Sequence, residues 1–141
     1  MIPGAPAASD APGSRRSTAS ALGVIGAVLG FIAVAAGAFG AHALRGRIDA
    51  AMLEVFQTAA HYQLAHSLAV VVVAVTLERR DSRPVKVAGW LFVIGVVLFS
   101  GSLFCLSLTG ARTWGLVTPF GGMCFLTGWA CLAVGWARRS A

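Results

Sequence analysis

Seven polar side chains are the residues of this sequence that could bind a ligand or move a proton. Histidine can donate or accept a hydrogen bond or ligate a metal, and tyrosine, glutamine and serine supply hydrogen bonds. All seven lie within or beside long apolar stretches, where a polar side chain is costly and often functional. They are His42, His61, Tyr62, Gln63, His66, Ser100 and Ser102.

The spacing of these residues argues against metal binding and catalysis. Tyr62 and Gln63 lie four and three residues before His66, so the three share one helical surface. His61 and His66 are five residues apart and lie on different faces, and no H-E-x-x-H motif occurs. Catalysis by serine and histidine also needs an orienting group, and Glu54 is the only nearby carboxylate. We therefore predict no metal, no cofactor, no catalytic residue and no enzymatic activity.

The composition indicates which elements must position these side chains. The chain has 141 residues, of which 57% are apolar and 11% are charged, whereas soluble domains are ~45–50% apolar and about 25% charged. Stretches without charge, each longer than the ~18 residues of a candidate transmembrane helix, cover 17–44, 55–77, 87–111 and 113–137. The apolar stretches do not alternate in polarity as barrel strands do. The sequence predicts an all-α integral membrane protein with four transmembrane helices.

The chain divides into three parts by composition. Residues 1–20, rich in Pro, Ala, Ser and Gly, are predicted to be a disordered tail, 21–137 a four-helix transmembrane domain and 138–141 a basic tail. The predicted spans are about 21–41, 59–77, 87–108 and 119–137. An amphipathic segment over 44–61, with Asp49 as its N-cap, is expected to run along the interface into the second span. Thr118 is the expected N-cap of the fourth span, with Pro119 at its first helical position.

The basic residues flank the apolar spans and predict the orientation. With four spans, the N-terminal tail, the loop 78–86 and the C-terminal tail share one side and carry eight Lys and Arg residues, against three on the other side. The positive-inside rule then predicts that both termini lie on the cytoplasmic side of a bacterial inner membrane. Charge beside apolar spans is typical of attraction to lipid head groups, so no nucleic-acid partner is expected.

Small residues recur three or four positions apart in the first and fourth spans. In lipid such ridges allow helices to approach closely. We expect helix packing at Gly26, Gly30, Gly37, Gly121, Gly128 and Gly135. The partner on these ridges is another helix of the chain, a second copy in a homo-oligomer, or another membrane protein, and the bilayer surrounds the rest.

The seven polar residues fall toward one leaflet, and two interpretations stay open. They could form hydrogen bonds that fix helix packing, or line an outward-facing crevice that binds a small ligand, a lipid or a proton. If they form one unit, His42 should lie close to Tyr62 or His66. On the first interpretation the protein acts through helix–helix association, and on the second it is a binding or transport unit.

Four motifs resemble one family, in order along the chain. They are "GAFGAHAL" (37–44), "FQTAAHYQLAHSLAV" (56–70), "GWLFVIGVVLFSGSLFCLSLTG" (89–110) and "TPFGGMCFLTGW" (118–129). They resemble the YgdD-like family of small bacterial membrane proteins, whose eukaryotic relatives are called transmembrane protein 256. The resemblance covers about 21–137 and implies a four-helix inner-membrane protein of a domain-of-unknown-function family. Phe56 stands where the family leads us to expect a tryptophan that anchors the helix at the interface.

Overall fold

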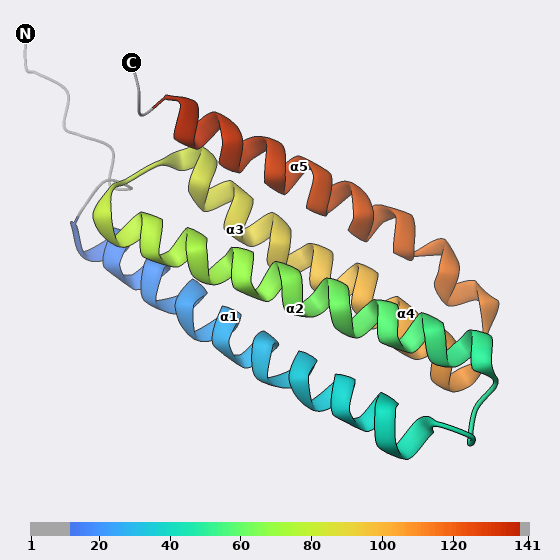
Figure 1. Ribbon diagram of the computed structural model, residues 1–141. Coiled ribbons are helices and arrows are strands. Elements are labelled where there is room, and N and C mark those ends of the chain that lie inside the picture. The colour runs from blue at the N-terminus through green and yellow to red at the C-terminus, as the bar shows by residue number, and fades with distance from the viewer. Residues whose placement is uncertain (1–11, 139–141) are drawn as a thin grey trace, which may run out of the picture.

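The fold is known from a computed structural model that describes residues 12–138 (Figure 1). Its elements are α1 (Pro12–Phe39), η2 (Gly40–Leu44), α2 (Ala50–Arg79), α3 (Arg83–Gly95), η3 (Val96–Ser100), α4 (Gly101–Thr109), η4 (Arg112–Leu116) and α5 (Thr118–Ala137). No strand occurs within this range. Four helical segments are long and apolar enough to cross a membrane: Arg16–Leu44, Ala50–Arg79, Arg83–Thr109 and Arg112–Ala137. The prediction of an all-α protein with four transmembrane helices is confirmed.

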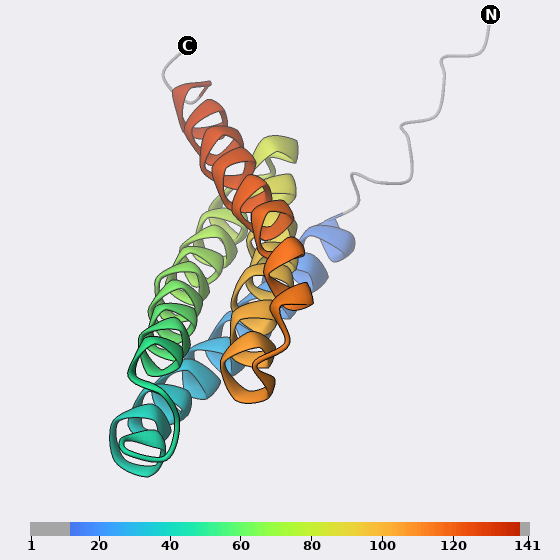
Figure 2. The same ribbon diagram turned by 90° about the vertical axis from the view of Figure 1, so that its right-hand side faces the viewer.

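The four spans run antiparallel in chain order, so that like ends gather (Figure 1). At one end α1 begins, α2 ends, α3 begins and α5 ends; we call it the Arg80 end. At the other, the His42 end, η2 leads into the turn before α2 and η4 leads into α5, as Figure 2 shows from that side. α1 packs along α2, and α3 packs along α5. Because α2 also contacts α3, η3 and α4, it is the central helix.

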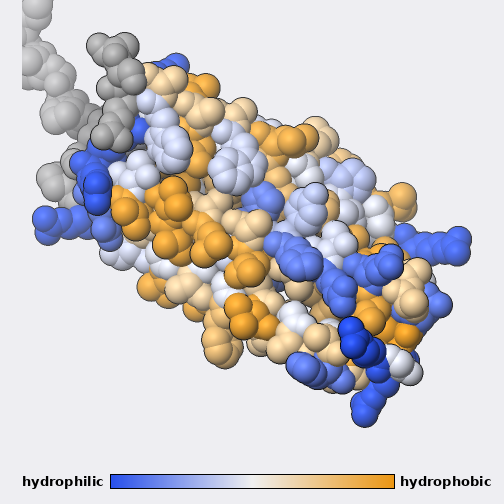
Figure 3. Space-filling view, viewed as in Figure 1, coloured by the Kyte–Doolittle hydropathy of each residue, from blue (hydrophilic) through white to orange (hydrophobic). Residues whose placement is uncertain are grey.

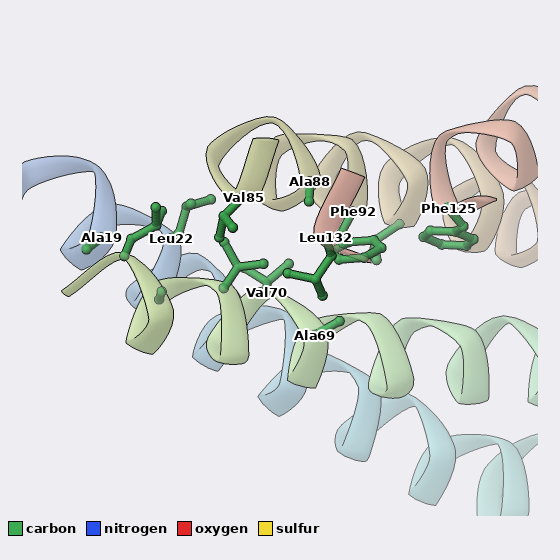
Figure 4. Close-up of a cluster of buried hydrophobic side chains, with 13 residues drawn as sticks. Ala19, Leu22, Ala69, Val70, Val85, Ala88, Phe92, Phe125 and Leu132 are labelled. Carbon is green, nitrogen blue, oxygen red and sulfur yellow. The ribbon is translucent and has the colours of Figure 1, made fainter. Parts of the chain in front are cut away.

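The apolar core lies in the half of the bundle nearer the Arg80 end. Figure 4 shows side chains of all four spans meeting there. Leu22, Val70, Val73, Val85 and Phe92 have no exposed surface at all. The polar residue His66 lies directly beside this core, with its ring centroid 3.5 Å from that of Phe125. Phe56, Ala59 and Ala60 are also buried, nearer the His42 end.

The outer surface suits lipid. Large apolar side chains remain exposed along the spans, including Phe31 at 76% and Leu126 at 74%. On the face shown in Figure 3, hydrophilic residues lie at both ends and extend from the His42 end to the middle, and apolar residues cover much of the rest. In water such a surface would aggregate, whereas in a bilayer it meets acyl chains.

The third span contains a π-helical turn. η3 lies between α3 and α4 without a break in the helix, and it is flanked by Gly95 and Gly101. A β-carbon at Gly95 would lie 2.5 Å from the ring of Phe125 on α5, so glycine is required for this approach. The span ends at Gly110, whose left-handed backbone (φ 70°) lets its N–H donate to the Leu106 carbonyl at 2.8 Å.

Two predicted boundaries differ from the structure. α1 begins at Pro12, so residues 12–20 of the predicted tail are helical; Ala19 is buried in the core (1% exposed), and its packing extends the helix beyond the apolar run. Residues 1–11 and 139–141 lie outside the described part, with most of the predicted tails. The amphipathic segment is no separate interfacial helix, because residues 45–49 form a turn and 50–61 are already the first turns of α2.

The predicted cap at Asp49 is confirmed. Its carboxylate accepts a hydrogen bond from the backbone N–H of Ala51 at 2.8 Å, which satisfies a donor that the helix itself leaves free. Phe56 then lies inside the bundle, 4% exposed, with its ring centroid 4.8 Å from that of Phe104. It packs between helices and does not anchor the chain at the interface.

Candidate functional site

The polar residues of α2 point to two different neighbours. Tyr62 and His66 contact aromatic rings of η3 and α5, whereas Gln63 bonds to α1. A helix turns about 100° per residue, so Tyr62 and His66 are about 40° apart around α2, while Gln63 is about 60° from His66 and about 100° from Tyr62, on the side that meets α1. The predicted cluster is therefore divided at its centre.

His66 is buried (7% exposed) and both of its ring nitrogens have partners. Nδ1 lies 2.8 Å from the carbonyl oxygen of Tyr62, and the indole N–H of Trp129 donates to Nε2 at 3.3 Å. An indole nitrogen can only donate, so Nε2 must accept and the proton must sit on Nδ1, which donates to the carbonyl. The neutral ring with this tautomer satisfies every hydrogen bond at the site.

Aromatic rings surround His66. Its ring stacks on Phe125 with centroids 3.5 Å apart and planes 10° from parallel, and Phe92 lies 5.7 Å away. Tyr62 packs against Phe99 at 4.5 Å. A groove of about 470 Å³ opens beside these residues, between α2 and α5, and its walls are mainly apolar. Its chemistry is that of a surface for acyl chains or apolar side chains.

A neighbouring face of α2, about 100° around the helix from that of Tyr62 and His66, is joined to α1. The side-chain amide of Gln63, 4% exposed, donates to the Leu29 carbonyl at 2.9 Å. The hydroxyl of Ser67 donates to the Leu64 carbonyl of its own helix at 2.7 Å. A β-carbon at Gly30 would lie 3.3 Å from that hydroxyl oxygen, which shows how closely the two helices approach.

A cleft opens between α1 and α2 toward the His42 end. It measures about 540 Å³ and is lined by Ala33, Val34, Gly37, Ala38, Ala41, Gln57, Ala60, His61 and Leu64. Only Gln57 and His61 are polar. No hydrogen bond joins either of these two side chains to another described residue.

The two predicted serines have separate surroundings. Ser102 and Thr118 share a hydrogen bond of 2.8 Å between their hydroxyls, which joins α4 to the start of α5. Thr118 is thus the first residue of α5 and not its cap, since its hydroxyl is engaged with Ser102. Ser100 is fully buried in η3, and its hydroxyl has no partner among the described residues.

His42 does not lie close to Tyr62 or His66. It lies in η2 with an exposed side chain, and no hydrogen bond or ring contact in the described part of the chain joins it to either residue. The reason is the position of His42 along the bundle. A β-carbon at Gly40 would touch the Phe56 ring, so Gly40 is level with Phe56, and His42, two residues later, lies nearer the turn. Tyr62 is six residues further into α2, roughly 9 Å of helical rise. The interpretation in which His42 shares one crevice with Tyr62 and His66 is therefore not met by the described residues.

Most of the predicted small residues lie at helix contacts. A β-carbon would lie 2.8 Å from Val71 at Gly26, 2.7 Å from Phe92 at Gly128 and 2.6 Å from Val85 at Gly135, and Gly121 meets the backbone of Phe99. Gly30 approaches Ser67, as described above. Gly37 is the exception, because a β-carbon there would meet nothing within 4 Å. It opens into the cleft instead.

The sequence did not single out Phe92, Phe99, Phe125 and Trp129, which complete the surroundings of Tyr62 and His66. In an apolar span, an aromatic residue that faces a partner has the same sequence pattern as one that faces lipid. The available signal was the four-residue spacing of Phe125 and Trp129, which places both on one face of α5. Between residues 12 and 138, no group of three or more His, Cys, Asp or Glu could hold a metal ion.

Comparison with known proteins places this arrangement in a family. Residues 36–122 match the family described as "Protein of unknown function (DUF423)". The UPF0382 inner membrane protein YgdD of Escherichia coli K12 is 45% identical over 115 residues, which are 82% of this chain and 88% of that protein. The UPF0382 membrane protein SH2409 of Staphylococcus haemolyticus is 40% identical over 111 residues, 79% of this chain and 90% of that protein. No solved structure matches. The chain belongs to the DUF423 family of YgdD-like, multi-pass membrane proteins.

Proposed function

We propose that the protein acts without catalysis, as a membrane subunit that associates with a second copy of itself through the cleft between α1 and α2. One observation carries the proposal: Gly37 continues the ridge of Gly26 and Gly30 on α1, yet no helix in the described part of the chain covers it. The ridge thus extends past its intramolecular partner.

The lining of the cleft suits a helix better than it suits lipid. Ala33, Gly37 and Ala41 are four residues apart, which is the spacing that lets two helices approach closely in a bilayer. Gln57 and His61 offer hydrogen bonds that acyl chains cannot accept. A helix in the cleft would bury Gly37 and Ala41, which are partly exposed, and would supply partners to both polar side chains.

A second copy is the occupant that the chain itself favours. In a two-fold dimer each patch faces its own equivalent, so the ridge of one α1 lies in the cleft of the other. From Ser17 to Leu44 there is no charged side chain, so two α1 helices can meet without repulsion between charges.

The state of the other polar residues supports a non-catalytic role. His66 uses both ring nitrogens within the bundle, and the hydroxyls of Ser67, Ser102 and Ser107 all bond to backbone carbonyls. A nucleophile and a base must face each other and a substrate. These side chains instead face their own helices and neighbours.

The same proposal includes the orientation: both termini lie on the cytoplasmic side of the bacterial inner membrane. Of the eleven Lys and Arg residues, eight belong by sequence to the two tails and the loop 78–86, and three, Arg45, Arg47 and Arg112, to the two other connections. The cleft then opens toward the outer leaflet.

The test is the fraction of dimer in lipid vesicles, measured by crosslinking as the ratio of protein to lipid is lowered. Gly37→Leu fills the cleft and should lower the dimer fraction roughly tenfold, an effect of the size expected for inserted volume, while monomer unfolding stays unchanged. Ala35→Leu is the matched control, since Ala35 is exposed on the opposite side of α1. A wild-type chain that stays monomeric at every ratio, or a Gly37→Leu variant that dimerises like wild type, would contradict the proposal.

A further inference from the structure

A second site lies at the Arg80 end, between the ends of α2 and α5. A pocket of about 410 Å³ there is lined by Val75, Thr76, Arg79, Arg80 and Trp136. It is far along α2 from the cleft of the proposed dimer. Two guanidinium groups and an indole stand where the spans reach the membrane surface, so the pocket is both cationic and amphipathic.

The Arg80 guanidinium is held in place. It is half-buried, and its Nη2 donates to the Gly135 carbonyl on α5 at 2.8 Å. A guanidinium has five N–H donors in a fixed plane, so one bond orients the group and leaves donors for a ligand. Arginine in this state is suited to bidentate binding of phosphate.

Arg79 supplies a second cation, which no residue in the described range neutralises. Its side chain is exposed, and no ion pair or hydrogen bond joins it to a residue in the described range. The two nearest carboxylates in sequence are placed elsewhere. Asp81 pairs with Lys86 at 2.7 Å, and Glu78 lines a separate hollow with Arg16 and Ser20.

The rest of the pocket identifies the kind of anion. Trp136 is 47% exposed at the end of α5, as expected for an indole at the level of lipid head groups. Val75, 45% exposed, lies one helical turn deeper on α2. Positive charge above an apolar wall fits a molecule with a phosphate at one end and a hydrocarbon chain at the other.

We propose that Arg79, Arg80 and Trp136 form a binding site for the phosphate of an anionic phospholipid, whose acyl chain lies along Val75. The site differs from the general attraction of a basic protein end to the bilayer. A neighbouring groove between α3 and α5 carries Arg83 and Arg138 over a similarly apolar wall, but no described hydrogen bond fixes either guanidinium. The two grooves therefore form a matched pair on one end of the molecule.

The experiment is native mass spectrometry of the purified full chain in detergent, with phosphatidylglycerol or phosphatidylcholine added. Wild type should retain phosphatidylglycerol in preference to phosphatidylcholine. Arg79→Gln should reduce that retention roughly fivefold, the effect of one cation near a lipid surface. Arg80→Lys, which keeps the charge and loses the planar fork, should reduce it as well.

Arg83→Gln is the control, because it removes the same charge from the same end. An equal loss of phosphatidylglycerol from Arg79→Gln and Arg83→Gln would overturn the site and leave only diffuse attraction. Equal retention of both lipids by wild type would also overturn it. A third measurement compares the unfolding temperature of the protein with inorganic phosphate and with phosphatidylglycerol. If inorganic phosphate raises this temperature as much as phosphatidylglycerol does, the ligand is a free anion and the lipid assignment is wrong. Circular dichroism and thermal unfolding without lipid confirm that each variant is folded.

Discussion

Trp129 on α5 donates a hydrogen bond of 3.3 Å to His66 on α2, and the ring of His66 stacks on Phe125 one turn away on the same helix as Trp129. These side chains bridge two helices whose backbones approach each other little, since α5 packs mainly on α3. A polar ring that was a candidate for chemistry is thus a connector between the two halves of the bundle.

The first prediction concerns the coupling between His66 and Trp129. His66→Leu and Trp129→Phe should each lower the free energy of unfolding, because each removes one partner of the hydrogen bond and leaves the other unsatisfied. Combined in a double-mutant cycle, they should show a coupling of about 0.6 kcal/mol, the average for such bonds between membrane helices, with ~1.7 kcal/mol as the upper end. Unfolding by SDS in mixed micelles measures this.

Trp114→Phe is the matched control for that cycle. Trp114 is 41% exposed and has no ring or hydrogen-bond partner for its side chain in the described part of the chain, so the change should leave stability unaltered. Zero coupling between His66 and Trp129 would show that the hydrogen bond does not form in the micelle. A His66→Leu variant that is as stable as wild type but loses the function of the protein in the cell would favour a binding role for the ring.

The second prediction separates glycines that touch a neighbour from glycines that do not. Gly128→Ala places a β-carbon 2.7 Å from the ring of Phe92, which is fully buried, so the ring or the helix must shift. We expect stability to fall by about 1–3 kcal/mol, the usual effect of overpacking. The measurement is the same unfolding titration.

Gly101→Ala is the comparison for Gly128→Ala. Its backbone has ordinary helical angles (φ −59°), and an added β-carbon meets nothing within 4 Å. Alanine is the better helix former by up to ~1 kcal/mol, so this variant should be as stable as wild type or slightly more stable. If both variants are destabilised equally, the close contact with Phe92 is not the cause.

The third prediction distinguishes the two glutamines of α2. Gln63→Leu removes the bond to the Leu29 carbonyl and should lower monomer stability by about 0.6 kcal/mol. Gln57→Leu should leave monomer stability unchanged, because Gln57 faces the cleft without a described partner, and should instead lower the dimer fraction. The reverse result, with Gln57 needed for the monomer and Gln63 for the dimer, would contradict the assignment of the two faces.

The sequence predicted the spans well because lipid imposes a strong condition on them. A helix must be apolar for about 20 residues to cross a bilayer, and that property is local. The same holds for the cap at Asp49, which depends on a few neighbouring residues. The π-helical turn at Val96–Ser100 was not predicted. Its residues contact α2 and α5, and contacts between spans cannot be read from a local sequence pattern.

The site was predicted in part, for a reason that Gln63 and His66 illustrate. Sequence gives the position of a side chain along its span, and both residues lie on α2 before the segment 69–77 that contributes to the apolar core. It does not give the rotation of the helix about its axis against all its neighbours. That rotation turns Gln63 to α1 and His66 to α5, and it leaves His42 apart from both.

The last prediction concerns the orientation in the membrane. Ser82 lies in the loop between α2 and α3 at the Arg80 end, and Thr113 lies in η4 at the His42 end. Arginine and lysine are retained on the cytoplasmic side during insertion, and eight of the eleven belong to the two tails and the loop 78–86. A cysteine at Ser82 should therefore be protected from an impermeant maleimide added to intact cells, and a cysteine at Thr113 should react.

Both variants need a background without Cys105, Cys124 and Cys131, which are half-buried in the third and fourth spans and would give a small signal of their own. Opening the cells with detergent should make the Ser82→Cys variant react, which shows that the site is accessible and was protected by the membrane. Labelling of Ser82→Cys in intact cells, with protection of Thr113→Cys, would reverse the orientation. The cleft and its Gln57 and His61 would then open toward the cytoplasm, and the cationic pocket of Arg79 and Arg80 would face the outer leaflet, because the positions of both sites along α2 are fixed relative to each other.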